Sequence, residues 1–386
     1  MSASERGQRP AARRAIALAC AAALLAPSAP GAATAAPAPH DGTSGHVRSL
    51  DGWPTTTPRA AGFKVGALRR LVREAKALDS SCYAVVRRGR VVTEHNWGQG
   101  RLQPREVFSI TKSVTSTLVG IAVRDGTLSL DDPVSDHVPQ WRGTESAGVT
   151  VRQLLSNTSG RSWSFQSDYK DLLAARNRTR YAIGLGQQFA PDSAWAYNNA
   201  AIQVLDAVLT SATGQDTATF AQERLFEPLG MRHTRMTRDA KGSTNVFFGL
   251  QTTCLDLARF GQLHLNRGAV AGRRIVSRSW VRAATGRSSS SLNAAYGLLW
   301  WLNRPGTLRG PTDPVDEFGQ PVTPVTGQLA PRARENTFAA VGLGGQVVFV
   351  DRGSRTVVVR LGRLGSGEQR PFTFADASRV VTDALR

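Results

Sequence analysis

The stretch Val107-Phe108-Ser109-Ile110-Thr111-Lys112-Ser113-Val114 joins a Ser-x-x-Lys tetrad to the start of an apolar helical run. A lysine three residues after a serine lies on the serine's own face of a helix. A helix N-terminus adds free N–H groups and partial positive charge there, and a crowded lysine can lose its proton near neutral pH. The stretch therefore predicts that Ser109 is an activated nucleophile. A serine N-cap followed by a solvated lysine is the alternative interpretation.

A second tetrad, Ser167-Asp168-Tyr169-Lys170, occurs further along the chain. The two tetrads differ in the residues that come after them. After Lys112 the apolar residues are spaced as one buried helix face, whereas an Arg-rich stretch comes after Lys170. This difference favours the first tetrad as the catalytic one.

The segment Ala196-Tyr197-Asn198-Asn199-Ala200 opens the strongest helical pattern of the chain, residues 200–212. Tyrosine has a reference pKa of about 10, so it is a poor base at neutral pH unless a cation lies nearby. Lys112 would supply that cation, and the Asn199 amide could orient the lysine or a substrate carbonyl. A tyrosine that merely packs before an Asn N-cap is the alternative.

A third segment, Val341-Gly342-Leu343-Gly344-Gly345-Gln346, comes just before a predicted strand. Glycine-rich backbone lets a carbonyl substrate approach closely, and one N–H there could complete an oxyanion hole with the N–H of Ser109. A tight turn or bulge is the alternative.

The composition is that of a globular protein, with 41% apolar and 20% charged residues among 386. Residues 1–36 place Arg13-Arg14 before a short apolar run and small residues, which predicts an export signal and a secreted or periplasmic protein. That run is too short to span a membrane. Residues 37–62 read as a flexible leader or surface arm. In an oxidising exterior Cys82 and Cys254 could form a disulfide; two buried free thiols are the alternative.

The formal net charge is +19, and nearly all the basic residues are Arg. Such a charge could favour association with an anionic surface such as a cell wall. Arg-rich usage in a high-GC genome is the alternative interpretation and the one that we favour. The sequence has no zinc finger, RNA-binding signature or dense basic run, so we expect no nucleic-acid partner. The usual α/β-hydrolase, metalloprotease and nucleotide-binding motifs are absent, and we expect no metal and no organic cofactor.

Hydrophobic spacing predicts the secondary structure along the chain. Strand-like runs occur near both ends, helical runs lie between them, residues 161–196 read as irregular, and the Pro-rich stretch 304–335 reads as a structureless loop. We therefore predict an α+β domain, residues 63–386. Its antiparallel sheet would come from about 80–97 and 337–362, flanked by helices, with an all-helical lobe at about 106–275.

The three motifs, in this order, resemble those of the serine β-lactamase-related hydrolases. That group includes class C β-lactamases, D-alanyl-D-alanine carboxypeptidases, family VIII esterases and 6-aminohexanoate-dimer hydrolases. The likeness runs from about residue 53 to the end and extends to Asp125–Val134, Val149–Gly160 and Phe226–Met231. It implies a β-lactamase/transpeptidase-like fold with the site between sheet and helical lobe. It also implies these roles: Ser109 as acylated nucleophile, Lys112 as activator, Tyr197 as proton shuttle and Asn199 as the last residue of Tyr-x-Asn.

The third motif departs from the pattern, because many members carry Lys or His there to bind a substrate carboxylate. Gly342-Leu343-Gly344-Gly345-Gln346 resembles the aminohexanoate-oligomer hydrolases and related esterases instead. In that branch the Leu343 N–H would be the second oxyanion donor, and a tyrosine near Tyr169 touches substrate. The resemblance thus implies a hydrolase of a small ester, amide or peptide-like substrate. A D-alanyl-D-alanine carboxypeptidase or β-lactamase is one alternative, and a penicillin- or wall-binding module that acylates without turnover is another.

Overall fold

The computed structural model describes residues 52–98, 100–312, 322–364 and 370–386. The predicted export signal lies outside these residues, as does the leader up to residue 51. The described part of the leader runs beside a strand, where the N–H of Thr56 donates to the Val91 carbonyl over 2.9 Å and the N–H of Val91 donates to Pro54 over 2.8 Å.

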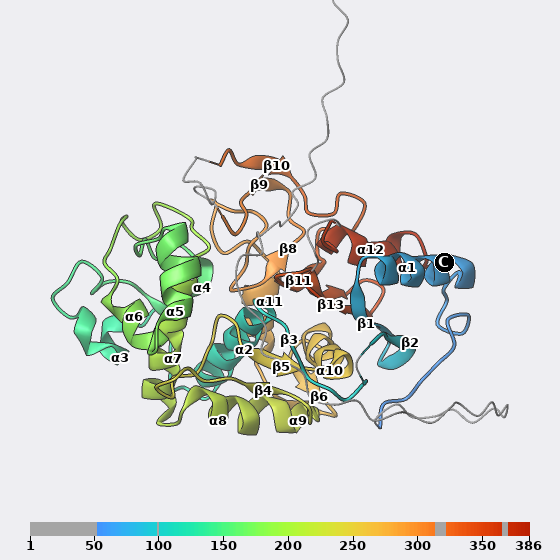
Figure 1. The fold of residues 1–386 in the computed structure, drawn as a ribbon, viewed down its shortest axis with the longest axis horizontal. Coiled ribbons are helices and arrows are strands. Elements are labelled where there is room, and N and C mark those ends of the chain that lie inside the picture. Colours follow the sequence, from blue (N-terminus) through green and yellow to red (C-terminus); the bar gives the residue numbers. More distant parts are fainter. Residues whose placement is uncertain (1–51, 99, 313–321, 365–369) are drawn as a thin grey trace, which may run out of the picture.

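The main sheet has six antiparallel strands in the order β2-β1-β13-β12-β11-β8. Both ends of the described chain contribute to it, as Figure 1 shows in blue and red. Its long strands are rich in valine, and the middle ones are buried on both faces. The strands are β1 (Ser80–Arg87), β2 (Arg90–Asn96), β8 (Trp301–Leu302), β11 (Phe338–Gly342), β12 (Gln346–Asp351) and β13 (Thr356–Gly362).

Helices cover both faces of this sheet. A Cβ at Gly261 of α10 (Cys254–Leu265) would lie 3.0 Å from the Val348 side chain, so this helix packs closely on one face. The Phe349 ring contacts Phe374 of α12 (Phe374–Thr382) at 5.3 Å, and α1 (Val65–Ala77) packs beside α12. Since neighbouring residues of a strand point to opposite faces, α10 and α12 lie on opposite sides. The predicted antiparallel sheet flanked by helices is confirmed.

The helical lobe is built around α7 (Asn199–Thr213), which is buried along most of its length. It packs against α2 (Ile110–Arg124), the helix that begins at the Ser-x-x-Lys tetrad. The other elements of this part are α3 (Val134–His137), η1 (Pro139–Trp141), α4 (Val151–Ser156), η2 (Ser167–Asp171), α5 (Leu172–Ala174), α6 (Arg178–Gly184), α8 (Thr217–Ala221), η3 (Gln222–Phe226) and α9 (Glu227–Leu229).

Two expectations for irregular chain were wrong. Within 161–196 the structure places η2, α5 and α6, because η2 and α6 pack on α7 and α5 packs on both of them. The Pro-rich stretch is not structureless either, since β9 (Gly306–Leu308) pairs with β10 (Val325–Gly327) in a ribbon. The stretch 106–275 is not all-helical as predicted, because the short strands β3 (Arg105–Glu106), β5 (Leu250–Thr252) and β4 (Arg235–Met236) form a small sheet, β6 (Ala269–Val270) pairs with β7 (Arg273–Arg274), and α10 packs on the main sheet. The last remaining element is α11 (Arg278–Thr285).

Cys82 and Cys254 form a disulfide, with their Cα atoms 6.4 Å apart. It joins β1 to the first residue of α10, and both side chains are buried. The two segments are distant in sequence but adjacent in space, because α10 packs across β1 as well as β12 and β13. The pairing that the sequence left open is therefore made.

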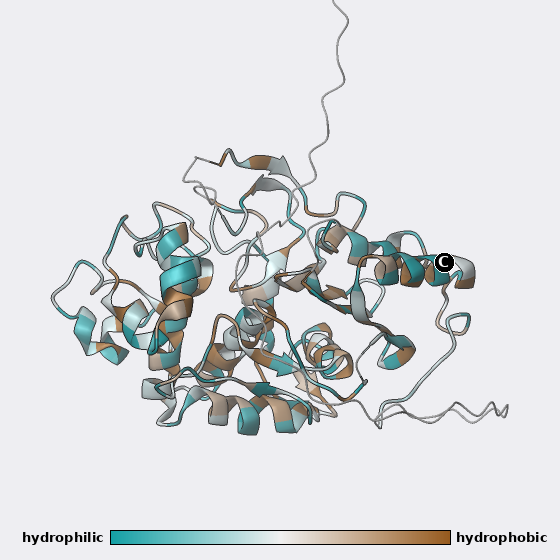
Figure 2. Ribbon diagram, in the orientation of Figure 1, coloured by the Kyte–Doolittle hydropathy of each residue, from teal (hydrophilic) through white to brown (hydrophobic). Residues whose placement is uncertain are grey.

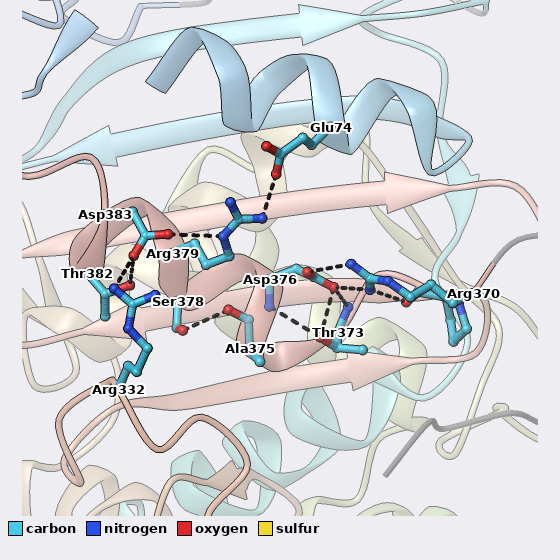
Figure 3. Close-up of polar contacts among 11 residues, drawn as sticks. Glu74, Arg332, Arg370, Thr373, Ala375, Asp376, Ser378, Arg379, Thr382 and Asp383 are labelled. Atoms are coloured by element: carbon cyan, nitrogen blue, oxygen red, sulfur yellow. Dashed lines mark hydrogen bonds and ion pairs between the residues drawn. The ribbon is translucent and has the colours of Figure 1, made fainter. Parts of the chain in front are cut away.

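Ion pairs join α12 to its neighbours (Figure 3). Arg379 contacts both Glu74 of α1 and Asp383, and Arg332 reaches Asp383 over 2.9 Å. These groups are partly exposed, so each pair stabilises the fold only slightly. Hydrophilic and hydrophobic residues alternate along α1 beside them (Figure 2). Among the described residues no helix is both long and apolar enough to cross a bilayer.

Candidate active site

Ser109 comes directly after a strained turn at the start of α2. Phe108, just before it, has a φ of +48°, a left-handed conformation that side-chain-bearing residues rarely adopt. The carboxylate of Glu106 holds this turn by accepting the N–H groups of Phe108 over 2.8 Å and Gly249 over 2.9 Å. The Thr111 hydroxyl donates to the Phe108 carbonyl over 2.6 Å. These bonds fix the backbone that presents Ser109. Burial raises the pKa of Glu106, against the effect of its N–H donors.

Lys112 contacts Ser109 directly. Its Nζ donates to Ser109 Oγ over 2.8 Å and to the Phe247 carbonyl over 2.9 Å. The side chain is only 1% exposed, and Nζ lies 4.7 Å from the centre of the Tyr197 ring. The Ser109 side chain makes no capping bond to its helix. The alternative of a serine cap with a solvated lysine is therefore wrong.

Tyr197 is held by aromatic neighbours just before α7. Its ring stacks on Trp301 at 5.9 Å, meets Tyr296 edge-on at 6.0 Å and lies 6.4 Å from Trp195. Such contacts fix the plane of the ring. Tyr197 does pack, as the alternative proposed, yet the same packing holds its ring over the Lys112 ammonium.

Asn198 caps α7, since its Oδ1 accepts the N–H of Ala201 over 2.7 Å. The amide of Asn199 instead donates from Nδ2 to Asp168 Oδ2 over 2.8 Å. Within Tyr-x-Asn, Asn198 thus caps the helix, whereas Asn199 contacts a buried acid.

Asp168 is the residue that the sequence analysis missed. It is 1% exposed, and burial raises its pKa to about 6, while N–H donors and nearby Lys112 oppose the rise. It belongs to the second tetrad, after which no buried helix face comes in the sequence. No sequence signal marked it, because it meets Asn199 across 31 positions of chain.

Tyr169, the next residue, stacks on Phe165 at 5.0 Å, and its hydroxyl donates to the Pro311 carbonyl over 3.0 Å. It therefore joins the helical lobe to the Pro-rich stretch beyond β9. Its role as a substrate contact stays a prediction.

The third motif lies against Ser109. Gly342 ends β11, and a Cβ on it would overlap the Val107 carbonyl and lie 3.2 Å from the Ser109 nitrogen. Only glycine permits this close approach. Leu343 begins a three-residue turn that closes where Gly342 pairs with Gln346. The segment is thus both a turn and a close backbone approach. The oxyanion role of the Leu343 N–H stays a prediction.

The Gln346 side chain stabilises this turn. Its Nε2 donates to the carbonyls of Leu343 over 3.1 Å and Gly362 over 2.9 Å, and its Oε1 accepts the N–H of Gly362 over 2.8 Å. All three bonds are made by a fully buried residue. The turn beside Ser109 is therefore anchored to β13.

A family model described as Beta-lactamase matches residues 68–375, most of the chain. The chain belongs to the β-lactamase family. This confirms the resemblance drawn from the three motifs. Within the family, the chain is 24% identical to the 6-aminohexanoate-dimer hydrolase of Paenarthrobacter ureafaciens over 298 residues, which cover 68% of this chain and 75% of that one. It is 34% identical to esterase EstB of Burkholderia gladioli over 143 residues, 32% of this chain and 36% of that one.

The fold is similar to solved structures of the β-lactamase family. A putative β-lactamase from Bacteroides dorei DSM 17855 superposes with a TM-score of 0.62 at 22% identity, covering 83% of this chain and 96% of that one. At this identity the likeness concerns the fold alone. The named relatives are hydrolases, so the chain stands among the hydrolases of this family.

Proposed function

We propose that the protein is a secreted serine hydrolase that cleaves an ester or amide bond through a covalent acyl-Ser109 intermediate. The observation that carries the proposal is the 2.8 Å contact between Lys112 Nζ and Ser109 Oγ, with the Tyr197 ring 4.7 Å from the same nitrogen. A serine bonded to a buried amine, with a tyrosine ring beside that amine, has the partners that nucleophilic catalysis requires.

In this mechanism Ser109 Oγ attacks the substrate carbonyl while Tyr197, acting with its neighbour Lys112 as the activating cation, removes the hydroxyl proton. The N–H groups of Ser109 and Leu343 bind the oxyanion of the tetrahedral intermediate. Tyr197 then protonates the leaving group. Water hydrolyses the acyl-enzyme, with the proton transfers reversed.

The third motif favours a substrate without a carboxylate at that position, because the motif has no cationic side chain to bind one. Gly342, Leu343 and Gly344 offer backbone but no Lys or His side chain. The names of two relatives, a 6-aminohexanoate-dimer hydrolase and an esterase, fit an amide or ester substrate. We therefore propose a small ester, a linear amide or a peptide-like molecule.

Secretion is supported by the character of residues 1–36 and by the Cys82–Cys254 disulfide, since disulfides persist in oxidising compartments. The exposed side of α1 carries Arg69, Arg70, Arg73 and Lys76. With the net charge of +19, this side would favour association with an anionic cell wall.

The test is turnover of a p-nitrophenyl ester panel, nitrocefin and short linear amide oligomers by the exported form of the protein. We expect Ser109→Ala to remain folded and to lose at least about 10³-fold in kcat. Ser116→Ala is the matched control, because Ser116 is buried in the same helix and its Oγ has no hydrogen-bond partner among the described residues. Near-wild-type turnover by Ser109→Ala would sink the proposal.

The same panel separates the alternatives. Nitrocefin cleavage would place a β-lactamase or D-alanyl-D-alanine carboxypeptidase first and would mean that another residue supplies the carboxylate-binding cation. A long-lived adduct on Ser109, seen by intact-protein mass spectrometry without turnover, would indicate a penicillin- or wall-binding module.

A further inference from the structure

Asp168 joins η2 to the first turn of α7 through three hydrogen bonds. Its Oδ2 accepts the Asn199 N–H over 3.0 Å and the Asn199 side-chain amide over 2.8 Å. Its Oδ1 accepts the Ala200 N–H over 2.8 Å. Both oxygens are therefore engaged inside the protein, where the side chain is 1% exposed.

These bonds act on the segment that presents the second motif. The first N–H groups of a helix have no partner within the helix, and an anion there is favoured by the helix dipole. Asp168 satisfies two of these N–H groups and also holds the Asn199 side chain. Tyr197 lies two residues before Asn199, so the carboxylate fixes the backbone from which the Tyr197 ring projects towards Lys112.

Asp168 is also electrostatically coupled to the activator of the nucleophile. Lys112 of α2 and Tyr181 of α6 are titratable groups that interact electrostatically with it. A negative charge near a buried ammonium favours the charged form of the lysine. A charged Lys112 in turn favours the phenolate of Tyr197, which is the form able to accept the Ser109 proton.

We propose that Asp168 is a positioning residue of this hydrolase, which holds Tyr197 and Asn199 in place through α7 and keeps Lys112 charged. The inference rests on the proposed function. Asp168 touches neither the reacting atoms nor the substrate in this scheme, and it acts only through the residues that do.

Asp206 provides a matched control, because it lies on α7, the helix to which Asp168 is bonded. It is buried, and burial raises its pKa to about 6, as for Asp168. Its partners are the hydroxyls of Thr179 over 2.8 Å and Thr217 over 2.9 Å, about two turns beyond Asn199. It thus shares the burial and the titration of Asp168 without its contact to the second motif.

The experiment compares Asp168→Asn with Asp206→Asn in the full hydrolase, measuring kcat, KM and the pH profile of kcat. We expect Asp168→Asn to lower kcat by about 10- to 100-fold with KM nearly unchanged, because misplaced catalytic groups slow the chemical step. Loss of the negative charge should also move the alkaline limb to lower pH by about one unit. Asp206→Asn should keep the wild-type profile.

Two outcomes would overturn the proposal: an Asp168→Asn profile that coincides with that of the wild type, or an equal shift in Asp206→Asn. The variant Asn199→Ala separates the positioning effect of Asp168 from the effect of its charge. It also replaces Asp168→Asn in the experiment if that variant does not fold. It removes one of the three bonds and leaves the carboxylate, so kcat should fall while the alkaline limb stays in place. A wild-type kcat in Asn199→Ala would contradict the positioning role.

Failure of the proposed function would look different. If the wild type cleaves no substrate of the panel, the same variants are compared by the rate at which a fluorophosphonate labels Ser109 across pH. Labelling needs the activated serine but no correct substrate. Labelling absent in the wild type rejects the catalytic site itself, whereas labelling that is equally fast in wild type and Asp168→Asn rejects only the role of Asp168.

Discussion

Gly342→Ala tests the site without removing any functional side chain. The added methyl group would overlap the Val107 carbonyl and lie 3.2 Å from the Ser109 nitrogen. Neither Gly342 nor Val107 can move away freely to relieve this overlap. Gly342 is paired with Gln346 across β11 and β12, and the N–H of Val107 donates to the Leu250 carbonyl over 3.1 Å.

The overlap should displace the Ser109 turn by roughly 0.5–1 Å, and a misplacement of that size can cost on the order of 10²-fold in rate. This corresponds to about 2.7 kcal/mol of transition-state stabilisation. We therefore expect kcat of Gly342→Ala to fall by about 10- to 100-fold, measured with the best ester or amide of the panel, together with a modest fall in Tm.

The control is Gly66→Ala in α1, where an added Cβ meets nothing within 4 Å. Alanine is the better helix former, so this variant should keep wild-type kcat and gain up to about 1 kcal/mol of stability. Wild-type kcat and Tm in Gly342→Ala would refute the reasoning, because the third motif would then lie elsewhere in the working protein.

Three further predictions concern the disulfide, a buried acid and the phenol. The double variant Cys82→Ala/Cys254→Ala opens a link across 172 positions and should lose about 5 kcal/mol of unfolding free energy in urea titrations; an unchanged midpoint would contradict this. The pKa of Asp206 is raised from 3.8 to about 6 in the folded state, so the folded protein binds more protons and stability falls as pH rises from about 4 to 6. Asp206→Asn should remove about 2–3 kcal/mol of that fall between pH 4 and 7, and an unchanged pH slope would count against it. Tyr197→Phe keeps the ring contacts, so it should lower kcat at least about 10²-fold with little change in Tm; an active variant would exclude the phenol as proton shuttle.

The parts of the site that depend on local spacing could be predicted from the sequence. Ser109 and Lys112 are three residues apart on one helix, so their contact follows from helix geometry alone. The valine-rich runs near both ends likewise predicted the strands of one antiparallel sheet, because β-branched residues favour strands.

The parts that depend on contacts between distant segments could not be predicted. Asp168 meets Asn199 only because η2 folds back onto α7, and Cys82 meets Cys254 only because α10 crosses β1. The strained conformation of Phe108 has no sequence signature either, since it is imposed by Glu106 and the β3–β5 pairing around it. The ribbon in the Pro-rich stretch depends on pairing between β9 and β10, across residues that lack a periodic pattern.

The pairing of β1 with β13 gives the order in which the site can be assembled. β1 can form this pairing only after β13 is synthesised, about 270 residues later. The strand β11, which ends at Gly342, is also synthesised late. Contacts of such long sequence separation form slowly. Ser109, Lys112 and Tyr197 are thus all synthesised before the strands that complete their surroundings. A chain halted before residue 338 would carry these three side chains and still lack the Gly342 turn that lies against Ser109.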